Sequence, residues 1–86
     1  MNNYETLDRL TPGELAVVDR LDVVGDMRRR FLDLGLIENT VVECIGRSPG
    51  GDPTAYLIRG AVIAIRSKDC QGIRIRKIGN EAPSWD

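Results

Sequence analysis

Arg30-Phe31-Leu32-Asp33-Leu34-Gly35-Leu36 is followed along the chain by two turn-forming stretches, Ser48-Pro49-Gly50-Gly51-Asp52-Pro53 and Arg59-Gly60. The first stretch has the pattern of an amphipathic helix closed by a glycine, and glycine and proline mark the other two as loops between strands. The predicted order is a helix, a hairpin with a Gly/Pro loop, and a second, tighter hairpin. These segments hold the apolar residues of a small barrel, and none of them carries the groups of an active site.

The helix that ends in the first stretch is predicted over residues 26–34. Asp26 is placed to cap its amino end by accepting from free backbone N–H groups, and Gly35 suits the left-handed position after the last turn. Three apolar residues recur at helical spacing and form one stripe: Met27, Phe31 and Leu34. We expect this stripe to cover the barrel as a lid.

Short segments rich in β-branched residues predict the strands. They lie at residues 14–18, 40–45, 54–59, 61–66 and 73–78. A single helical turn is expected at residues 67–70, directly before the last strand. About five strands with one inserted α-helix and this short turn describe a mainly β fold, a small SH3-like antiparallel barrel.

A length of 86 residues with 42% hydrophobic content suits one compact domain. Residues 1–10 are expected to be an N-terminal lead-in, residues 11–78 the barrel, and residues 79–86 a flexible tail that carries Trp85. No apolar stretch approaches the roughly 20 residues that span a bilayer, and the first residues lack the pattern of a signal peptide. The expected location is the cytoplasm.

The net charge of −1 argues against a dedicated nucleic-acid binder, because such domains are usually strongly basic. The charge is unevenly spread, with two arginines and six acids in residues 1–27 but six basic residues and one acid in residues 59–78. Basic residues of the second segment are candidates for a shared face along one side of the sheet: Arg59, Arg66, Arg74, Arg76 and Lys77.

Catalytic chemistry is not supported, because the chain has no histidine and so cannot form a Ser/His or Cys/His nucleophile pair. Cys44 and Cys70 lie 26 positions apart without a CxxC spacing, which favours two buried thiols in a reducing cytoplasm. Asp52 is expected to hydrogen-bond its own backbone and hold its loop. The residues therefore predict no catalytic group, no metal ligand, no cofactor and no enzyme.

Two exposed regions are candidates for a partner-binding surface, the flank of the helix and the Gly/Pro loop. Their residues are Arg28 and Arg29 on the helix, and Pro49, Gly50, Gly51 and Asp52 in the loop. Loops and insertions on a rigid barrel tend to carry recognition. A solvated face is the simpler interpretation of the arginines, since charged runs are common on protein surfaces.

Several stretches together resemble the FeoA family, the small ferrous iron transport protein A. They are Thr11-Pro12-Gly13-Glu14, the helix end at 30–36, the loop at 48–53, Tyr56-Leu57-Ile58-Arg59-Gly60 and Ile63-Ala64-Ile65-Arg66. The resemblance covers roughly residues 7–78. It implies an SH3-like barrel with an inserted helix that serves as a non-enzymatic cytoplasmic accessory or regulator of ferrous iron uptake. The implied partner is a FeoB-type membrane GTPase transporter, contacted at its cytoplasmic GTP-binding region, with membrane association only through the transporter.

The sequence departs from the family pattern before the third strand, where Glu38-Asn39 replaces the usual Pro-Gly and Asn39 can still adopt a left-handed turn. Two other functions stay open beside the adaptor: a stand-alone SH3-like module that binds nucleic acid, or a sensor of a transition metal. A single-strand binder would need stacking aromatics among its basic residues, and only Tyr56 is near them.

Overall fold

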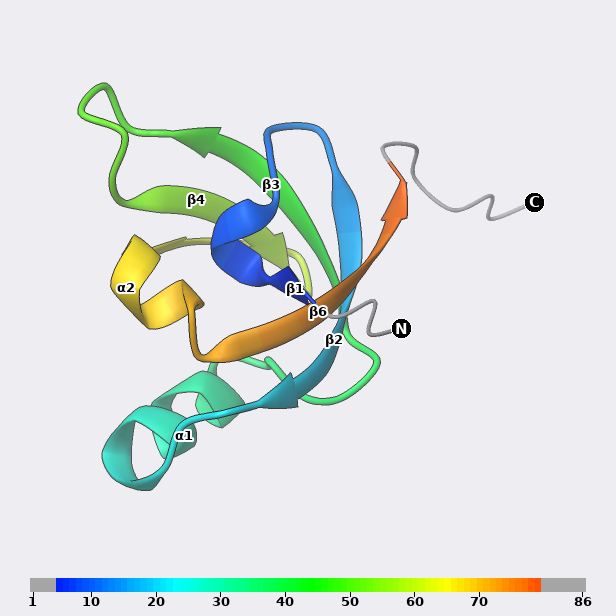
Figure 1. The fold of residues 1–86 in the computed structure, drawn as a ribbon, viewed down its shortest axis with the longest axis vertical. Helices are drawn as coiled ribbons and strands as arrows, with labels where there is room; N and C mark the ends of the chain where they lie inside the picture. The colour runs from blue at the N-terminus through cyan, green and yellow to red at the C-terminus, as the bar shows by residue number, and fades with distance from the viewer. Residues whose placement is uncertain (1–4, 80–86) are drawn as a thin grey trace.

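The computed structural model describes residues 5–79 and folds them into one bent antiparallel sheet with short helices around it (Figure 1). The elements are β1 (Glu5–Thr6), a 3-10 turn η1 (Leu7–Arg9), β2 (Leu15–Leu21), α1 (Gly25–Asp33), β3 (Val41–Arg47), β4 (Thr54–Ile58), β5 (Ala61–Ile65), α2 (Ser67–Cys70) and β6 (Ile73–Gly79). The strand order is β1-β6-β2-β3-β4-β5. The predicted mainly β architecture, with one inserted helix and a helical turn before the last strand, is confirmed.

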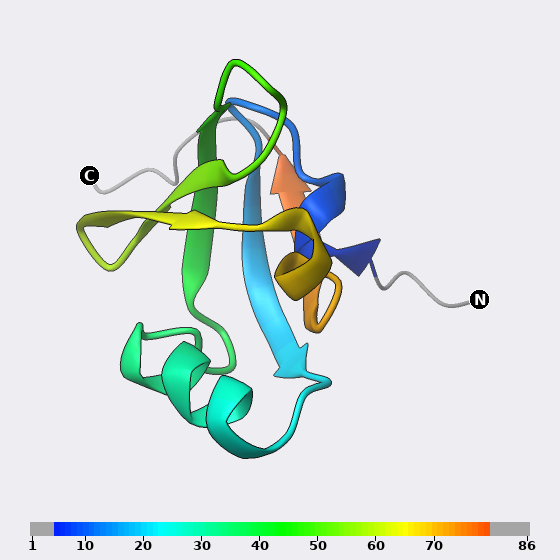
Figure 2. The same ribbon diagram turned by 90° about the vertical axis from the view of Figure 1, so that its left-hand side faces the viewer.

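Within residues 5–79 the sheet has six strands where about five were expected, and β1 and β5 at its two edges do not pair with each other. Register shifts between β2 and β6 and between β3 and β4 mark irregular positions, and such bulges bend a strand and increase its twist. The bend is visible in Figure 2, where β5 runs across the directions of β2 and β3. The strands therefore curl around a core without closing a hydrogen-bonded ring.

The additional strand comes from the segment that the sequence analysis set apart as a lead-in. Within residues 1–10, the described part pairs with β6 as β1 and then forms η1. Leu7 and Leu10 are both 0% exposed, so this segment is part of the domain. A two-residue strand is too short for alternation to reveal it. Of the expected tail at residues 79–86, Gly79 ends β6 and the rest, with Trp85, lies outside the described residues.

Helix α1 covers one end of the curled sheet, below β5 in Figure 2. Phe31 is 2% exposed, and Met27 and Leu34 pack against the buried core, which confirms the predicted lid. Gly35 has the left-handed φ of +97° that was predicted after the helix. The expected cap is wrong, because Val24 occupies the N-cap position and no side-chain hydrogen bond caps the helix; Asp26 lies inside the first turn.

The core consists of side chains from every described strand except β1, together with residues of η1, α1 and α2 and of the segments that follow η1 and α1. Its buried members are Leu7, Leu10, Ala16, Val18, Phe31, Leu36, Val42, Cys44, Tyr56, Ile58, Ile65, Cys70, Ile73 and Ile75. Ile73 and Ile75 thus face inward as their alternation predicted, and both cysteines are buried as free thiols. The tight reversal before β5 is also confirmed, with positive φ at Arg59 and Gly60.

Candidate functional site

The helix flank chosen from the sequence is exposed to solvent. Arg28 and Arg29 are both exposed, and Arg28 donates from Nη1 to the carbonyl oxygen of Leu21 over 3.5 Å. Arg28 also lines a hollow of about 310 Å³ between α1 and the end of β2, together with Leu32 and Ile37. These two apolar side chains are 39% and 44% exposed. The flank thus combines a cation with accessible apolar surface.

The β3–β4 loop is a closed turn held by its own hydrogen bonds. Gly51 donates its N–H to the carbonyl of Ser48 over 2.7 Å, and the N–H and hydroxyl of Ser48 donate to the carbonyl of Pro53 over 3.0 and 2.9 Å. Pro49 and Gly50 are exposed at its tip. A partner would therefore meet a preformed loop.

Asp52 has a different role from the one expected. Its Oδ1 accepts from the backbone N–H of Ser67 over 2.8 Å and from the Ser67 hydroxyl over 3.2 Å. This carboxylate therefore joins the loop to the first turn of α2, where free N–H groups need acceptors. The prediction that Asp52 bonds its own turn is wrong, because the sheet places the start of α2 within reach of the loop.

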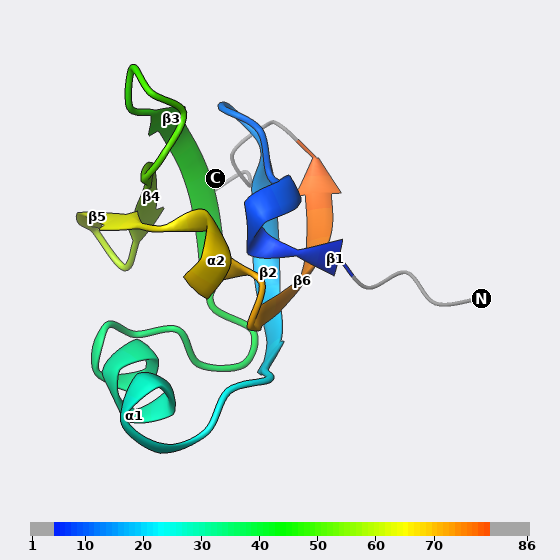
Figure 3. The same cartoon turned by 60° about the vertical axis from the view of Figure 1, so that its left-hand side comes forward.

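The two parts of the candidate surface lie far apart. Figures 2 and 3 show α1 at one end of the molecule and the tip of the β3–β4 loop at the other, with β5 between them. The structure therefore brings Arg28 and Arg29 together but does not join them with Pro49, Gly50 and Gly51 into one continuous patch. The helix flank and the loop are two separate candidate contacts.

The basic residues of β6 do not form the expected shared face. Three of them pair with acids from the N-terminal part of the chain: Arg74 with Asp22, Arg76 with Asp19 over 3.6 Å, and Lys77 with Glu14 over 3.4 Å and Glu5 over 3.8 Å. In the strand order, β2 and β3 separate β6 from the β4–β5 hairpin that carries Arg59 and Arg66. The acidic and basic segments of the sequence thus meet each other across neighbouring strands.

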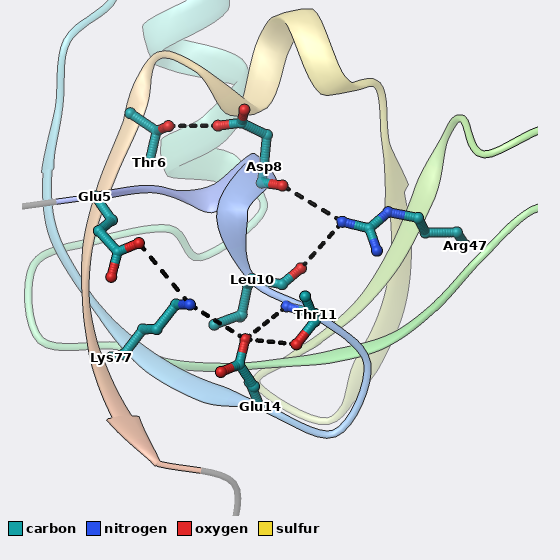
Figure 4. A network of polar contacts seen from close by, with 8 residues as sticks. All are labelled: Glu5, Thr6, Asp8, Leu10, Thr11, Glu14, Arg47 and Lys77. Atoms are coloured by element: carbon teal, nitrogen blue, oxygen red, sulfur yellow. Dashed lines mark hydrogen bonds and ion pairs between the residues drawn. The ribbon is translucent and has the colours of Figure 1, made fainter.

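A polar network ties the N-terminal segment to β3 and β6 (Figure 4). The carboxylate of Glu14 accepts from the N–H and hydroxyl of Thr11 over 2.8 and 2.7 Å and lies beside Lys77. These hydrogen bonds, with the nearby ammonium, lower the pKa of Glu14. Arg47 donates to the carbonyls of Asp8 and Leu10, each over 3.5 Å. These contacts hold β1 and η1 against the sheet. They give the charged groups of Glu14, Lys77 and Arg47 a structural role.

Burial disfavours the ionised forms of Tyr56, Cys44 and Cys70. The Cys70 thiol donates to the Tyr56 hydroxyl over 3.5 Å, and this hydroxyl donates to the carbonyl of Leu7 over 3.3 Å. Burial raises the pKa of Tyr56 far above its usual range, raises the pKa of Cys70 to about 11 and raises the pKa of Cys44. Thiols in such apolar surroundings stay protonated and inert. Within residues 5–79, no group of three or more histidine, cysteine or acidic side chains could hold a metal ion.

A second hollow, of about 280 Å³, lies between α1 and β5. Two arginines line it, Arg30 from α1 and Arg66 from the end of β5. From the sequence, Arg66 was expected beside the basic residues of β6, and Arg30 was not among the candidate contact residues. The approach of α1 to β5 depends on the tertiary structure. Neither described helix, α1 or α2, is long and apolar enough to cross a membrane.

Comparison with known families gives a match over nearly the whole described chain. The model of the FeoA domain matches residues 5–77. A curated protein of Porphyromonas gingivalis, the Fe(2+) transport protein A/Fe(2+) transporter FeoB fusion protein, is 28% identical over 78 residues. This alignment covers 91% of the chain but only 9% of the fusion protein. The resemblance found in the sequence is thereby confirmed.

Solved structures have the same fold. The iron(II) transport protein A of Clostridium thermocellum superposes with a TM-score of 0.82 at 27% identity, covering 86% of this chain and 46% of that one. The zinc-complexed FeoA of Stenotrophomonas maltophilia, described as a prokaryotic SH3 domain protein, gives a TM-score of 0.75 at 23% identity and covers 83% of this chain and 88% of that one. The SH3-like class predicted from the sequence is therefore confirmed.

Proposed function

Since this chain belongs to the FeoA family, we propose that it is a non-enzymatic cytoplasmic accessory of ferrous iron uptake that contacts a FeoB-type transporter. The observation that carries the proposal is the relative in which transport protein A and FeoB form one polypeptide. Covalent fusion keeps two modules at high effective concentration, as suits parts that work in contact. The inert thiols and the absence of histidine agree with a role in binding.

The proposed contact is made by the helix flank, with Arg28 and Arg29, and by the loop residues Pro49, Gly50, Gly51 and Asp52. The flank offers cations beside exposed Leu32 and Ile37, a combination common where proteins bind each other. The loop offers a preformed turn. The expected partner surface on the transporter is its cytoplasmic GTP-binding region, which would bring acidic side chains to the flank.

The test is binding of the purified chain to the isolated GTP-binding region of a FeoB-type transporter, measured by calorimetry. Reversing both charges with Arg28→Glu and Arg29→Glu is expected to weaken binding about tenfold or more, because like charges then face each other at the contact. The matched control is Arg9→Glu, an exposed arginine in η1 that lines neither hollow.

The loop is tested separately because it lies at the other end of the molecule. Replacing the exposed Gly50 with aspartate leaves its turn intact, since a Cβ there meets nothing within 4 Å. Reduced binding of this variant would support a loop contact. If both the flank and the loop variants bind as the unaltered chain does, the proposed surface is refuted; if the unaltered chain fails to bind, the partnership itself is refuted.

A further inference from the structure

The hollow between α1 and β5 has an apolar floor and two walls from different parts of the chain. Met27 and Phe31 of α1, with Leu34 directly after it, line the hollow together with Ile63 and other residues of β5. Phe31 and Leu34 already pack on the core, so the floor of the hollow is continuous with the hydrophobic interior. A side chain entering from a partner would therefore bury apolar surface against the edge of the core.

The rim of the hollow carries cations without acidic partners. Arg30 on one wall and Arg66 on the other form no ion pair with any described carboxylate. This contrasts with β6, where Arg74, Arg76 and Lys77 are all paired. Asp69 is the single carboxylate among the described residues of the lining, so cations prevail at this rim. Charge complementarity therefore favours an acidic occupant.

One wall is also the open edge of the sheet. β5 is the last strand of the order and pairs only with β4 among the described strands. Ile58 pairs with Ala61 across a two-residue turn with positive φ at both positions, and the register then runs without a shift. Opposed residues in an antiparallel ladder alternate between bonded and unbonded pairs. The N–H and C=O groups of Val62 and Ala64 consequently point away from β4, toward the unpaired side.

We propose that this hollow binds an extended acidic segment of a partner protein, which adds as a strand along the free edge of β5. Backbone hydrogen bonds to Val62 and Ala64 hold the segment, apolar side chains enter the floor, and carboxylates reach Arg30 and Arg66. Strand addition to an open edge gives affinity through the main chain and specificity through alternate side chains. The inference goes beyond the transporter contact proposed above, because it specifies the chemistry of the segment and a surface distinct from Arg28 and Arg29.

The probe is a short, fluorescently labelled peptide that alternates valine and glutamate, titrated into the purified chain and followed by anisotropy. We expect saturable binding that weakens with salt, and much weaker binding of the same peptide with lysine in place of glutamate. The double variant Arg30→Glu and Arg66→Glu should lower affinity about tenfold or more, since it removes both attractive charges and adds two repulsive ones. Arg9→Glu serves again as the control and should bind as the unaltered chain does.

Strand addition is tested by amide hydrogen exchange, with and without saturating peptide. The amides of Val62 and Ala64 should become protected, whereas the amide of Ile63, already bonded to β4, should change little. Unchanged exchange at Val62 and Ala64 would overturn the proposed strand addition. If the lysine peptide binds equally well, or if the double variant binds the glutamate peptide undiminished, the proposed acidic character of the bound segment is overturned. An oligothymidine that binds with the same dependence on both arginines would overturn the choice of a peptide ligand.

The peptide assay and the transporter assay test different claims, and their outcomes can be told apart. Peptide binding needs only the purified chain, and its loss in the Arg30 and Arg66 variant does not involve the helix flank. A chain that binds the GTP-binding region but no acidic peptide would refute this inference alone. A chain that binds the peptide but no transporter region would refute the proposed partnership and support the hollow as a peptide site.

Discussion

Tyr56 connects three segments of the chain through one buried hydroxyl group. It lies on β4, donates to the carbonyl of Leu7 in η1 and accepts from the thiol of Cys70 in α2. The sequence placed this residue in a strand, in a stretch that resembles the FeoA family and near basic side chains, but predicted no role for its hydroxyl group. Its burial instead makes it part of the core, where a polar group needs partners because water is excluded.

We predict that Tyr56→Phe destabilises the domain by about 1–3 kcal/mol, since the carbonyl of Leu7 loses its buried donor while the ring still fills its space. Urea unfolding followed by circular dichroism measures the change. Cys70→Ala is the companion variant, because it removes the other partner of the hydroxyl but leaves the bond to Leu7. A Tyr56→Phe protein as stable as the unaltered chain would show that this hydrogen bond contributes nothing to stability.

At the scale of elements, two aspartates near the starts of the helices have roles that differ from the sequence-based predictions. Local spacing suggested that Asp26 caps α1 and that Asp52 hydrogen-bonds the backbone of its own loop. In the structure Asp26 makes no capping bond, whereas Asp52 bonds to Ser67 at the start of α2. A cap 15 residues away depends on how β4 and β5 pair between the two sites, and local pattern carries no information about it.

We predict that Asp52→Ala destabilises the domain by about 0.5–2 kcal/mol through loss of the acceptor for Ser67. Asp26→Ala is the matched control, with an expected change within about 0.5 kcal/mol because it breaks no capping bond. Thermal unfolding of both variants checks the pair. Equal effects of the two substitutions would contradict the assignment of Asp52 as the acceptor at α2.

On the scale of the whole molecule, the distribution of charge is organised by the strand order. The N-terminal acids and the C-terminal cations are remote in sequence, yet β6 lies between β1 and β2 and pairs the two sets. The arginines of α1 and Arg66 beside β5 form no ion pair with a described carboxylate, so their charges remain available to a partner. The net charge of the chain is −1, and it does not indicate which cations are paired and which are free to meet a partner.

We predict that a chain starting at Thr11 fails to fold, although the sequence pattern alone placed the barrel at residues 11–78. The truncation removes β1 and the buried Leu7 and Leu10, and each lost leucine side chain is worth about 2–5 kcal/mol. A domain of this size has little more stability than that. A chain starting at Glu5 keeps these contacts and should unfold cooperatively on heating. A cooperative transition in the shorter chain would show that η1 is dispensable.

The helix, the turns and most strands follow from the sequence by itself, because apolar periodicity and turn residues such as Gly35 and Gly60 act on backbone conformation within a few residues. The same local signals identified the buried stripe of α1 and the inward isoleucines of β6. The joining of β1 to β6, the bond from Asp52 to Ser67 and the hollow between α1 and β5 were decided only by the tertiary structure. Each of these depends on contacts between segments distant in the chain, whose partners are selected by the bend and strand order of the complete sheet.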